Sequence, residues 1–262
     1  MSYPSLLLSA IAAPTSVAKA EVLAGIAAPD EGATWPMPDI PSYPGRAVEM
    51  IETSEPQRRR RSLADLGSRK RFLHAIHHIE LSAVDLAVLL CLRAGGAPRA
   101  LHQDFLAIAR EEAEHAQLLE GWLAEAGCPP GTYPIHHRLW QAAAACVDLG
   151  EQLVVVPRYL EAKGLDVSAG VIPRLAAVDA RAGAIIQRIY TDEIRHVAIG
   201  TRWHAWWCQA HATTPTAHFA RVVRARFRDQ LPSPMALDRP GRVQAGFSEE
   251  ELAILEEPRA GG

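Results

Sequence analysis

The chain has 262 residues and a formal net charge of −3; 48% of its residues are apolar and 22% are charged. This balance supplies enough apolar surface for a sizeable buried core and excludes a chain that is disordered throughout. The near-neutral charge also argues against a nucleic-acid-binding surface that extends over the whole chain.

Cysteine spacing and hydropathy indicate the cellular compartment in which the protein is expected. No two cysteines form a CxxC pair, so we expect reduced and mostly buried thiols instead of a zinc finger or a disulfide framework. No uninterrupted apolar run reaches the roughly 18 residues of a membrane span. The apolar residues Leu6–Leu8 have no basic segment before them and Pro14 follows closely, which argues against a signal peptide. We therefore expect a cytoplasmic protein. The cysteines are Cys91, Cys128, Cys146 and Cys208.

The N-terminal part is expected to cover the rest of the protein. Residues 5–28 are rich in Ala and Leu and predict one or two short helices, interrupted at Pro14. Six prolines within residues 29–56 predict an extended strap. We interpret Arg58–Arg61 as a solvated linker in preference to a phosphate-binding run.

From Ser62 onward the apolar residues recur at helical spacing for about 150 residues. Strand-type alternation is scarce, so the chain is expected to be all-α, with a ferritin-like four-helix bundle. We expect an N-terminal part at 1–61, the bundle at 62–212 and a helical C-terminal extension at 213–262. The bundle helices are predicted from Ser62 to the Gly95–Pro98 turn, at 99–126, at 136–163 with a kink at Pro157 and a break at 164–168, and at 180–210 after a short helical piece.

Two of these helices carry the same pairing of a carboxylate and an imidazole. Glu112 and His115 lie on the second expected helix, and Glu193 and His196 lie on the fourth. Residues three apart in a helix share nearly the same face, so each pair presents both side chains together. Two Glu-x-x-His pairs, with one Glu from each of two further helices, form the dimetal site of ferritin-like carboxylate proteins.

Spacing selects the two remaining carboxylates. Glu80 and Glu161 each precede the glutamate of the next Glu-x-x-His pair by 32 residues. In an antiparallel helix pair two residues meet only if the turn lies midway between them. The midpoints are residue 96, inside a Gly-Gly-Ala-Pro turn, and residue 177, beside Asp179, which can cap the following helix. Glu151 is an alternative to Glu161, because its midpoint with Glu193 falls at the plausible turn near residue 172.

The charge of this set matches two divalent cations. Four carboxylates and two neutral imidazoles balance two such ions, and four buried carboxylates without a metal would be strongly destabilising. Oxygen-rich ligation suits iron or manganese better than zinc. We predict two iron ions, or one iron and one manganese, bound by Glu80, Glu112, His115, Glu161, Glu193 and His196.

Several neighbouring residues are candidates for supporting roles. Metal-bound histidines usually donate their second N–H to a carboxylate, and the residue before each pair is acidic. We predict Glu111 and Asp192 as these partners, each reaching the opposite helix, with Arg195 neutralising one of them. His77 and Tyr190 each lie three residues before a predicted ligand, so they are candidates for an extra ligand or proton carrier and a redox-active phenol. Packing or hydrogen bonding in the core is the alternative for both.

The sequence resembles a bacterial ferritin-like family catalogued as a domain of unknown function. The resemblance rests on segments 77–81, 111–115, 160–167 and 192–196, and extends to the Pro-rich strap and to residues 245–252. It covers most of the chain and implies a ferritin-like fold with a dimetal site, without a substrate. The match of 160–167 is a second reason to prefer Glu161 over Glu151.

More distant likenesses indicate a reaction class. The run from Asp192 to His196 resembles the second iron motif of soluble di-iron oxygenases and acyl-carrier-protein desaturases. The arrangement is also distantly similar to the tRNA hydroxylase that modifies a methylthio-isopentenyl adenosine. Two features depart from these families: the doubled histidine at 77–78, and Glu114 where related sites often carry Arg.

We therefore expect an oxidoreductase that activates O₂ at two iron ions to hydroxylate or oxidise a small-molecule or RNA-borne substrate, supplied by an electron donor. One alternative is a ferroxidase, metal-handling or peroxide-scavenging protein. The other is a non-catalytic helical binding protein that uses Arg58–Arg61 and the arginines between 221 and 228. The near-neutral charge disfavours a nucleic-acid partner, no membrane contact is expected, and a homodimer is compatible with the sequence.

Overall fold

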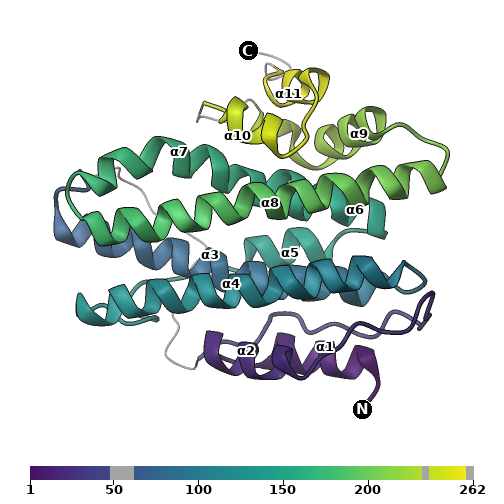
Figure 1. Cartoon of the computed structure of the whole chain (residues 1–262), viewed down its shortest axis with the longest axis horizontal. Coiled ribbons are helices and arrows are strands. Elements are labelled where there is room, and N and C mark those ends of the chain that lie inside the picture. The colour runs from purple at the N-terminus through teal and green to yellow at the C-terminus, as the bar shows by residue number, and fades with distance from the viewer. Residues whose placement is uncertain (48–61, 232–235, 258–262) are drawn as a thin grey trace. The chain divides into compact units, whose positions relative to one another are not determined.

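A computed structural model describes residues 1–47, 62–231 and 236–257 (Figure 1). These residues are helical or irregular and contain no strand, which confirms the all-α class. The arginine run at 58–61 lies outside the described residues. Contacts divide the chain into two compact units: the first unit holds 1–145 and 174–185, and the second unit holds 146–173 and the chain from 186 onward. The expected three-part division at 61 and 212 stays a prediction.

A long helical hairpin forms the centre of the first unit. Helix α3 spans Leu66–Arg93 and helix α4 spans Arg99–Glu125, close to the predicted bounds. Asp65 begins α3 by accepting a hydrogen bond from the backbone N–H of Ser68. The turn follows at the predicted place, where Gly96 has a φ of 83° that favours glycine. The two helices run side by side (Figure 1) and pack along their length.

The N-terminal segment packs on this hairpin. Helices α1 (Tyr3–Ala12) and α2 (Ser16–Ala24) are separated at Pro14 as predicted, and they contact α3 and α4 respectively. The strap that follows, residues 25–47, contains no helix. It runs so close to the end of α1 that a Cβ at Gly45 would overlap the backbone of Ala12. Helix α5 (Arg138–Ala144) packs against α3.

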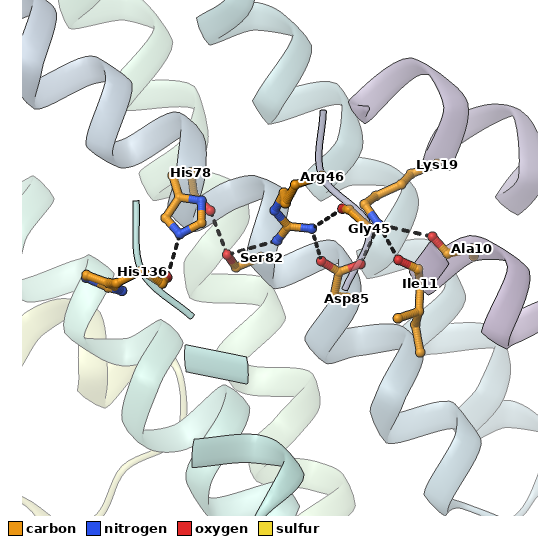
Figure 2. A network of polar contacts seen from close by, with 9 residues as sticks. All are labelled: Ala10, Ile11, Lys19, Gly45, Arg46, His78, Ser82, Asp85 and His136. Carbon is orange, nitrogen blue, oxygen red and sulfur yellow. Dashed lines mark hydrogen bonds and ion pairs between the residues drawn. The ribbon is translucent and has the colours of Figure 1, made fainter. Parts of the chain in front are cut away.

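Figure 2 shows a buried charge network that fastens the N-terminal segment to α3. Asp85 lies in the C-terminal half of α3, where its carboxylate accepts a hydrogen bond from Lys19 Nζ at 2.6 Å and forms an ion pair with Arg46 Nη1 at 2.8 Å. Lys19 also donates to the carbonyl oxygens of Ala10 and Ile11. Burial lowers the pKa of Lys19, and Asp85 opposes that shift. The carboxylate of Asp85 therefore connects α3 to α2 through Lys19 and to the strap through Arg46, and Lys19 in turn binds the end of α1.

Helix α3 is also the most apolar long helix. By length and composition it could cross a membrane, although its sequence contains no uninterrupted apolar run of that length. Most of its apolar window is buried inside the protein, as in the central helix of a soluble protein.

Helices α7 (Ala162–Ala176) and α8 (Ala180–Ala210) are joined by a short turn. The turn lies where predicted, and Asp179 accepts a hydrogen bond from the backbone N–H of Ala182 at 2.9 Å. The expected helix break at 164–168 is wrong, because α7 continues through it. A glycine inside a helix costs only about 1 kcal/mol, and the buried pair of Asp166 with Arg242 at 2.7 Å holds this part of α7 in place.

The predicted third helix is divided into several pieces. After α5 the chain leaves the helical conformation at 145–148, and Asp148 then caps helix α6 (Leu149–Leu153). A π-helix, η1, spans Val154–Glu161 and contains Pro157, so the predicted kink is a widened turn. A Cβ at Gly200 of α8 would overlap Pro157, so this glycine permits the close approach of the two helices.

The C-terminal extension is helical, as predicted. Helix α9 spans Pro215–Phe227 and is followed by a 3₁₀ turn, η2, at Arg228–Gln230. Helix α10 covers Arg239–Gln244, and helix α11 covers Glu249–Leu255 with a capping box at its N-terminus. The extension and η1 pack together within the second unit.

Candidate metal centre

Two carboxylates converge on one imidazole inside the first unit. Nδ1 of His115 lies 3.2 Å from Oε2 of Glu80 and 3.4 Å from Oε2 of Glu112. All three side chains are buried. The α3–α4 hairpin positions them, because its tight turn at Gly96 brings Glu80 to the level of the Glu112–His115 pair. These residues form a buried Glu/His group that can hold a metal ion.

The electrostatics of this group favour a cation. Burial raises the pKa of the Glu80 carboxyl to about 7, and repulsion from Glu112 adds to the shift. Burial alone would lower the pKa of His115, but hydrogen bonds to Glu112 and Glu80 outweigh it and raise this pKa to about 11. In the metal-free chain the two carboxylates therefore retain a proton on the imidazole between them. A bound cation would take over the role of that proton.

The second unit contains the other predicted ligands. Glu193 and His196 are buried on α8, with His196 Nδ1 3.9 Å from Oε1 of Glu193. Glu161 is buried and is the last residue of the π-helix η1, and α7 begins directly after it at Ala162. Short π-helical segments frequently occur at functional sites. Each unit thus contains one buried Glu-x-x-His pair and one further buried glutamate.

The contacts of Glu151 distinguish it from Glu161. Glu151 forms an ion pair with Arg226 at 2.6 Å and accepts a hydrogen bond from the backbone N–H of Val147. The hydrogen bond from Arg226 lowers the pKa of Glu151. A carboxylate that is already committed to an arginine and to the entry of α6 is a poor metal ligand, so these contacts favour Glu161.

The predicted supporting residues have other identifiable contacts. Asp192 lies 3.8 Å from both Arg188 and Arg195 on its own helix, and Arg195 is exposed. Glu111 is half-buried on α4. Their assignment as partners of the metal-bound histidines stays a prediction.

His77 and Tyr190 each bind an acidic residue. His77 is buried and its Nε2 donates to Oε1 of Glu120 at 2.8 Å. The hydroxyl of Tyr190 donates to Oδ2 of Asp238 at 2.7 Å, within the second unit. Neither Glu120 nor Asp238 was predicted as a partner of these residues. In an antiparallel hairpin, the residues before Glu80 on α3 lie level with those after His115 on α4. His77 precedes Glu80 by three residues and Glu120 follows His115 by five, so this pairing could have been considered from the sequence.

Comparisons with known proteins support the expected membership in a family of unknown function. Residues 9–253 match the family described as "Protein of unknown function (DUF455)". An uncharacterized protein of Haemophilus influenzae is 30% identical over 226 residues, which cover 83% of this chain and 77% of the relative. No solved structure matches the chain. Neither name states an activity, so the function must be argued from the residues themselves.

Proposed function

We propose that this chain, which belongs to the DUF455 family of proteins of unknown function, is a ferritin-like dimetal oxidoreductase. Two iron ions, or one iron and one manganese, would be held by Glu80, Glu112, His115, Glu161, Glu193 and His196. The reaction would use O₂ to hydroxylate or oxidise a substrate. The substrate would be a small molecule or a nucleoside in RNA, with a separate electron donor.

One observation carries this proposal: two buried carboxylates meet at a single imidazole nitrogen. Two ionised carboxylates carry two negative charges, whereas a protonated His115 carries only one positive charge. The group of Glu80, Glu112 and His115 is therefore neutral only if a further proton is retained, and the raised pKa of Glu80, about 7, reflects this. A buried group of this kind is strongly destabilising unless a cation compensates it. Carboxylate oxygens with one imidazole per ion form the donor set that suits iron or manganese.

The second unit supports a centre with two ions. It repeats the same pattern of a buried Glu-x-x-His pair and a buried glutamate, at Glu193, His196 and Glu161. The spacing of 32 residues is the same in both hairpins, and both turns occur at the expected midpoints. The proposal that the two sets share one centre rests on this matched spacing and on the charge balance of the six ligands.

The chain's own residues would have three roles. The glutamates hold the cations and offset their charge, and His115 presents Nδ1 toward the carboxylates. Apolar residues of α4 at helical spacing from Glu112, among them Phe105 and Ile108, are buried and would help to keep water from the ligands. When bound, the two metal ions supply the redox chemistry for O₂ reduction.

Metal content per chain tests the proposal. We compare the wild type with Glu112→Gln and with Glu114→Gln, a matched control on an exposed residue of the same helix. The wild type and the control should each hold about two metal ions after anaerobic loading with ferrous iron, and Glu112→Gln should lose at least half of them. A folded wild-type chain that binds no iron under these conditions would overturn the proposal.

Oxygen uptake by the loaded protein separates the two classes of activity. Consumption of O₂ that increases when a substrate is added supports an oxygenase. Consumption that depends only on ferrous iron or peroxide would instead establish the metal-handling alternative and overturn the oxygenase assignment.

A further inference from the structure

A second group of metal-binding side chains lies elsewhere, entirely within the second unit. His204 and Cys208 are on α8 and His218 is on α9, and all three are buried. Nε2 of His204 lies 2.9 Å from Nδ1 of His218 and 3.3 Å from Sγ of Cys208. Each residue offers one ligand atom, and the three atoms lie within 4.8 Å of one another.

The local sequence explains how the three side chains meet. His204 and Cys208 are four residues apart, so they lie one above the other on the same face of α8. After α8 the backbone N–H of Thr213 donates to the carbonyl of Cys208, and Thr214 then caps α9. This short connection places His218 in the first turns of α9. The ring of Trp207 packs against His218 with their centroids 4.7 Å apart, which fixes the imidazole.

We propose that His204, Cys208 and His218 form a separate binding site for a thiophilic divalent cation such as Zn²⁺. The donor set of one thiolate and two imidazoles contains no carboxylate, so its preference differs from that of the Glu/His centre. The site lies outside the six residues of the proposed dimetal centre and does not depend on that assignment. Three protein ligands leave a fourth position on a tetrahedral ion.

The distances are compatible with one ion. Zinc bonds of about 2.0 Å to nitrogen and about 2.3 Å to sulfur require ligand atoms roughly 3.3 to 3.6 Å apart in a tetrahedral site. The observed separations of 2.9 and 3.3 Å are slightly shorter. To hold the ion, these two pairs of ligand atoms would therefore have to move apart by only a few tenths of an ångström, a change that rotation of the His204 and His218 rings could supply.

Proton positions in the metal-free site follow from Arg158. Its guanidinium can only donate, and Nη1 lies 2.8 Å from Nδ1 of His204. Nε2 of His204 therefore carries the proton and donates to Nδ1 of His218. Arg158 also donates to Glu251 at 2.6 Å, and it lies over the rings of Phe219 and Phe247.

Metal binding must rearrange these protons. The cation takes the place of the Nε2 proton of His204 and of the thiol proton of Cys208. His204 remains neutral by carrying its proton on Nδ1, so Arg158 turns from Nδ1 and keeps its ion pair with Glu251. The site takes up one divalent cation and releases one proton, which comes from the thiol.

Cobalt is a suitable probe because Co²⁺ bound to a thiolate has a near-ultraviolet charge-transfer band that carboxylate ligation does not give. Chelator-treated full-length protein is titrated with Co²⁺ and then with Zn²⁺. We expect one equivalent of thiolate-bound cobalt, displaced by zinc. Cys208→Ala should abolish the band, and His218→Gln should weaken cobalt binding at least tenfold. Cys146→Ala, which changes another buried cysteine of the second unit, should leave the band unchanged.

The Glu112→Gln variant separates this proposal from the proposed function. It removes a ligand of the Glu/His centre and should leave the thiolate band intact. If Cys208→Ala fails to fold by circular dichroism, X-ray absorption of the zinc-loaded wild type decides instead, with one sulfur and two imidazole nitrogens expected. A thiolate band that persists in folded Cys208→Ala, or zinc without a sulfur neighbour in the wild type, would overturn the proposal.

Discussion

Replacement of Asp85 by Asn tests whether charge pairing fastens the N-terminal segment to α3. Asp85 is the carboxylate shared by Lys19 and Arg46, and Lys19 is fully buried. In Asp85→Asn both cations lose their anion, and Lys19 retains only the carbonyls of Ala10 and Ile11 as acceptors. Removal of one partner from a buried ion pair costs about 3–5 kcal/mol. We expect a loss of this size in the free energy of unfolding.

Lys19→Met is the matched control for this change. It removes one of the two cations, so Asp85 keeps a partner of opposite charge in Arg46 at 2.8 Å. The carbonyl of Ile11 also keeps its hydrogen bond from the backbone N–H of Gly45. The remaining cost is the loss of the hydrogen bonds from Nζ, about 1–2 kcal/mol. Asp85→Asn should therefore be the more damaging of the two by at least about 1 kcal/mol.

Urea denaturation followed by far-ultraviolet circular dichroism measures both variants. The measurement distinguishes a charged Lys19, which needs the Asp85 carboxylate, from a neutral Lys19, which does not. A neutral Lys19 must be considered because burial lowers the pKa of this lysine. If Asp85→Asn costs less than about 1 kcal/mol, or no more than Lys19→Met, the lysine is held neutral and the reasoning from charge pairing is refuted. Amide hydrogen exchange in α1 and α2 provides a second readout, since these helices should open first in Asp85→Asn.

Two further predictions concern packing and pH. Gly200→Ala should destabilise the chain by about 1–3 kcal/mol, because the new Cβ overlaps Pro157. In Gly164→Ala the new Cβ meets nothing within 4 Å, so this variant should stabilise α7 by up to about 1 kcal/mol. Urea denaturation of both variants checks this, and equal effects would contradict it. In the metal-free chain, burial raises the pKa of Glu80 from 4.5 to about 7, and its carboxylate neighbours raise that of His115 from 6.5 to about 11. At these two groups the folded chain holds more protons than the unfolded chain, so their contribution to stability falls as the pH rises through both intervals. Buried histidines with a lowered pKa, among them His74, His78 and His102, act in the opposite sense below about pH 6.5. Thermal melts of the wild type and Glu80→Gln isolate the contribution of Glu80, because the histidines are common to both: the melting temperature of the wild type relative to that of Glu80→Gln should fall as the pH rises from about 5 to 7; a relative melting temperature that rises over this range would contradict the assignment.

The long helices were predictable because their signals are local. Apolar residues at helical spacing predicted α3, α4 and α8, and the turns needed only Gly96 and Asp179. The Glu-x-x-His pairs were visible for the same reason, since a spacing of three fixes their common face. The four cysteines are free and buried, as predicted.

The remaining features depend on contacts between residues far apart in the chain. Gly164 predicted a helix break, but the pair of Asp166 with Arg242, 76 residues later, holds α7 together. The π-helix η1 packs on α8 where Gly200 lies against Pro157, and a Cβ at that position would overlap the proline. The local helix propensity of a segment gives no information on contacts between distant residues, such as Asp166 with Arg242 or Gly200 with Pro157. Such tertiary contacts routinely override local propensity.

Asp85 illustrates a signal that was present and could not be interpreted. A carboxylate within the apolar run from Leu81 to Leu92 must have a partner. The sequence does not reveal that the partners are Lys19 and Arg46, because both come from a segment whose path over α3 is set by Pro-rich irregular structure.

The chemistry of the two candidate sites explains how one chain could keep two metals apart. The group at Glu80, Glu112 and His115 offers hard carboxylate oxygens, whereas the group at His204, Cys208 and His218 offers a thiolate and nitrogens. Affinity for divalent metals at a given site follows a common order, so selectivity must come from donor type and geometry. A thiolate near redox-active iron would also be open to oxidation. Placement of Cys208 in a separate group within the second unit, without a carboxylate ligand, would suit a zinc ion with three protein ligands and one open position, distinct from the proposed redox centre.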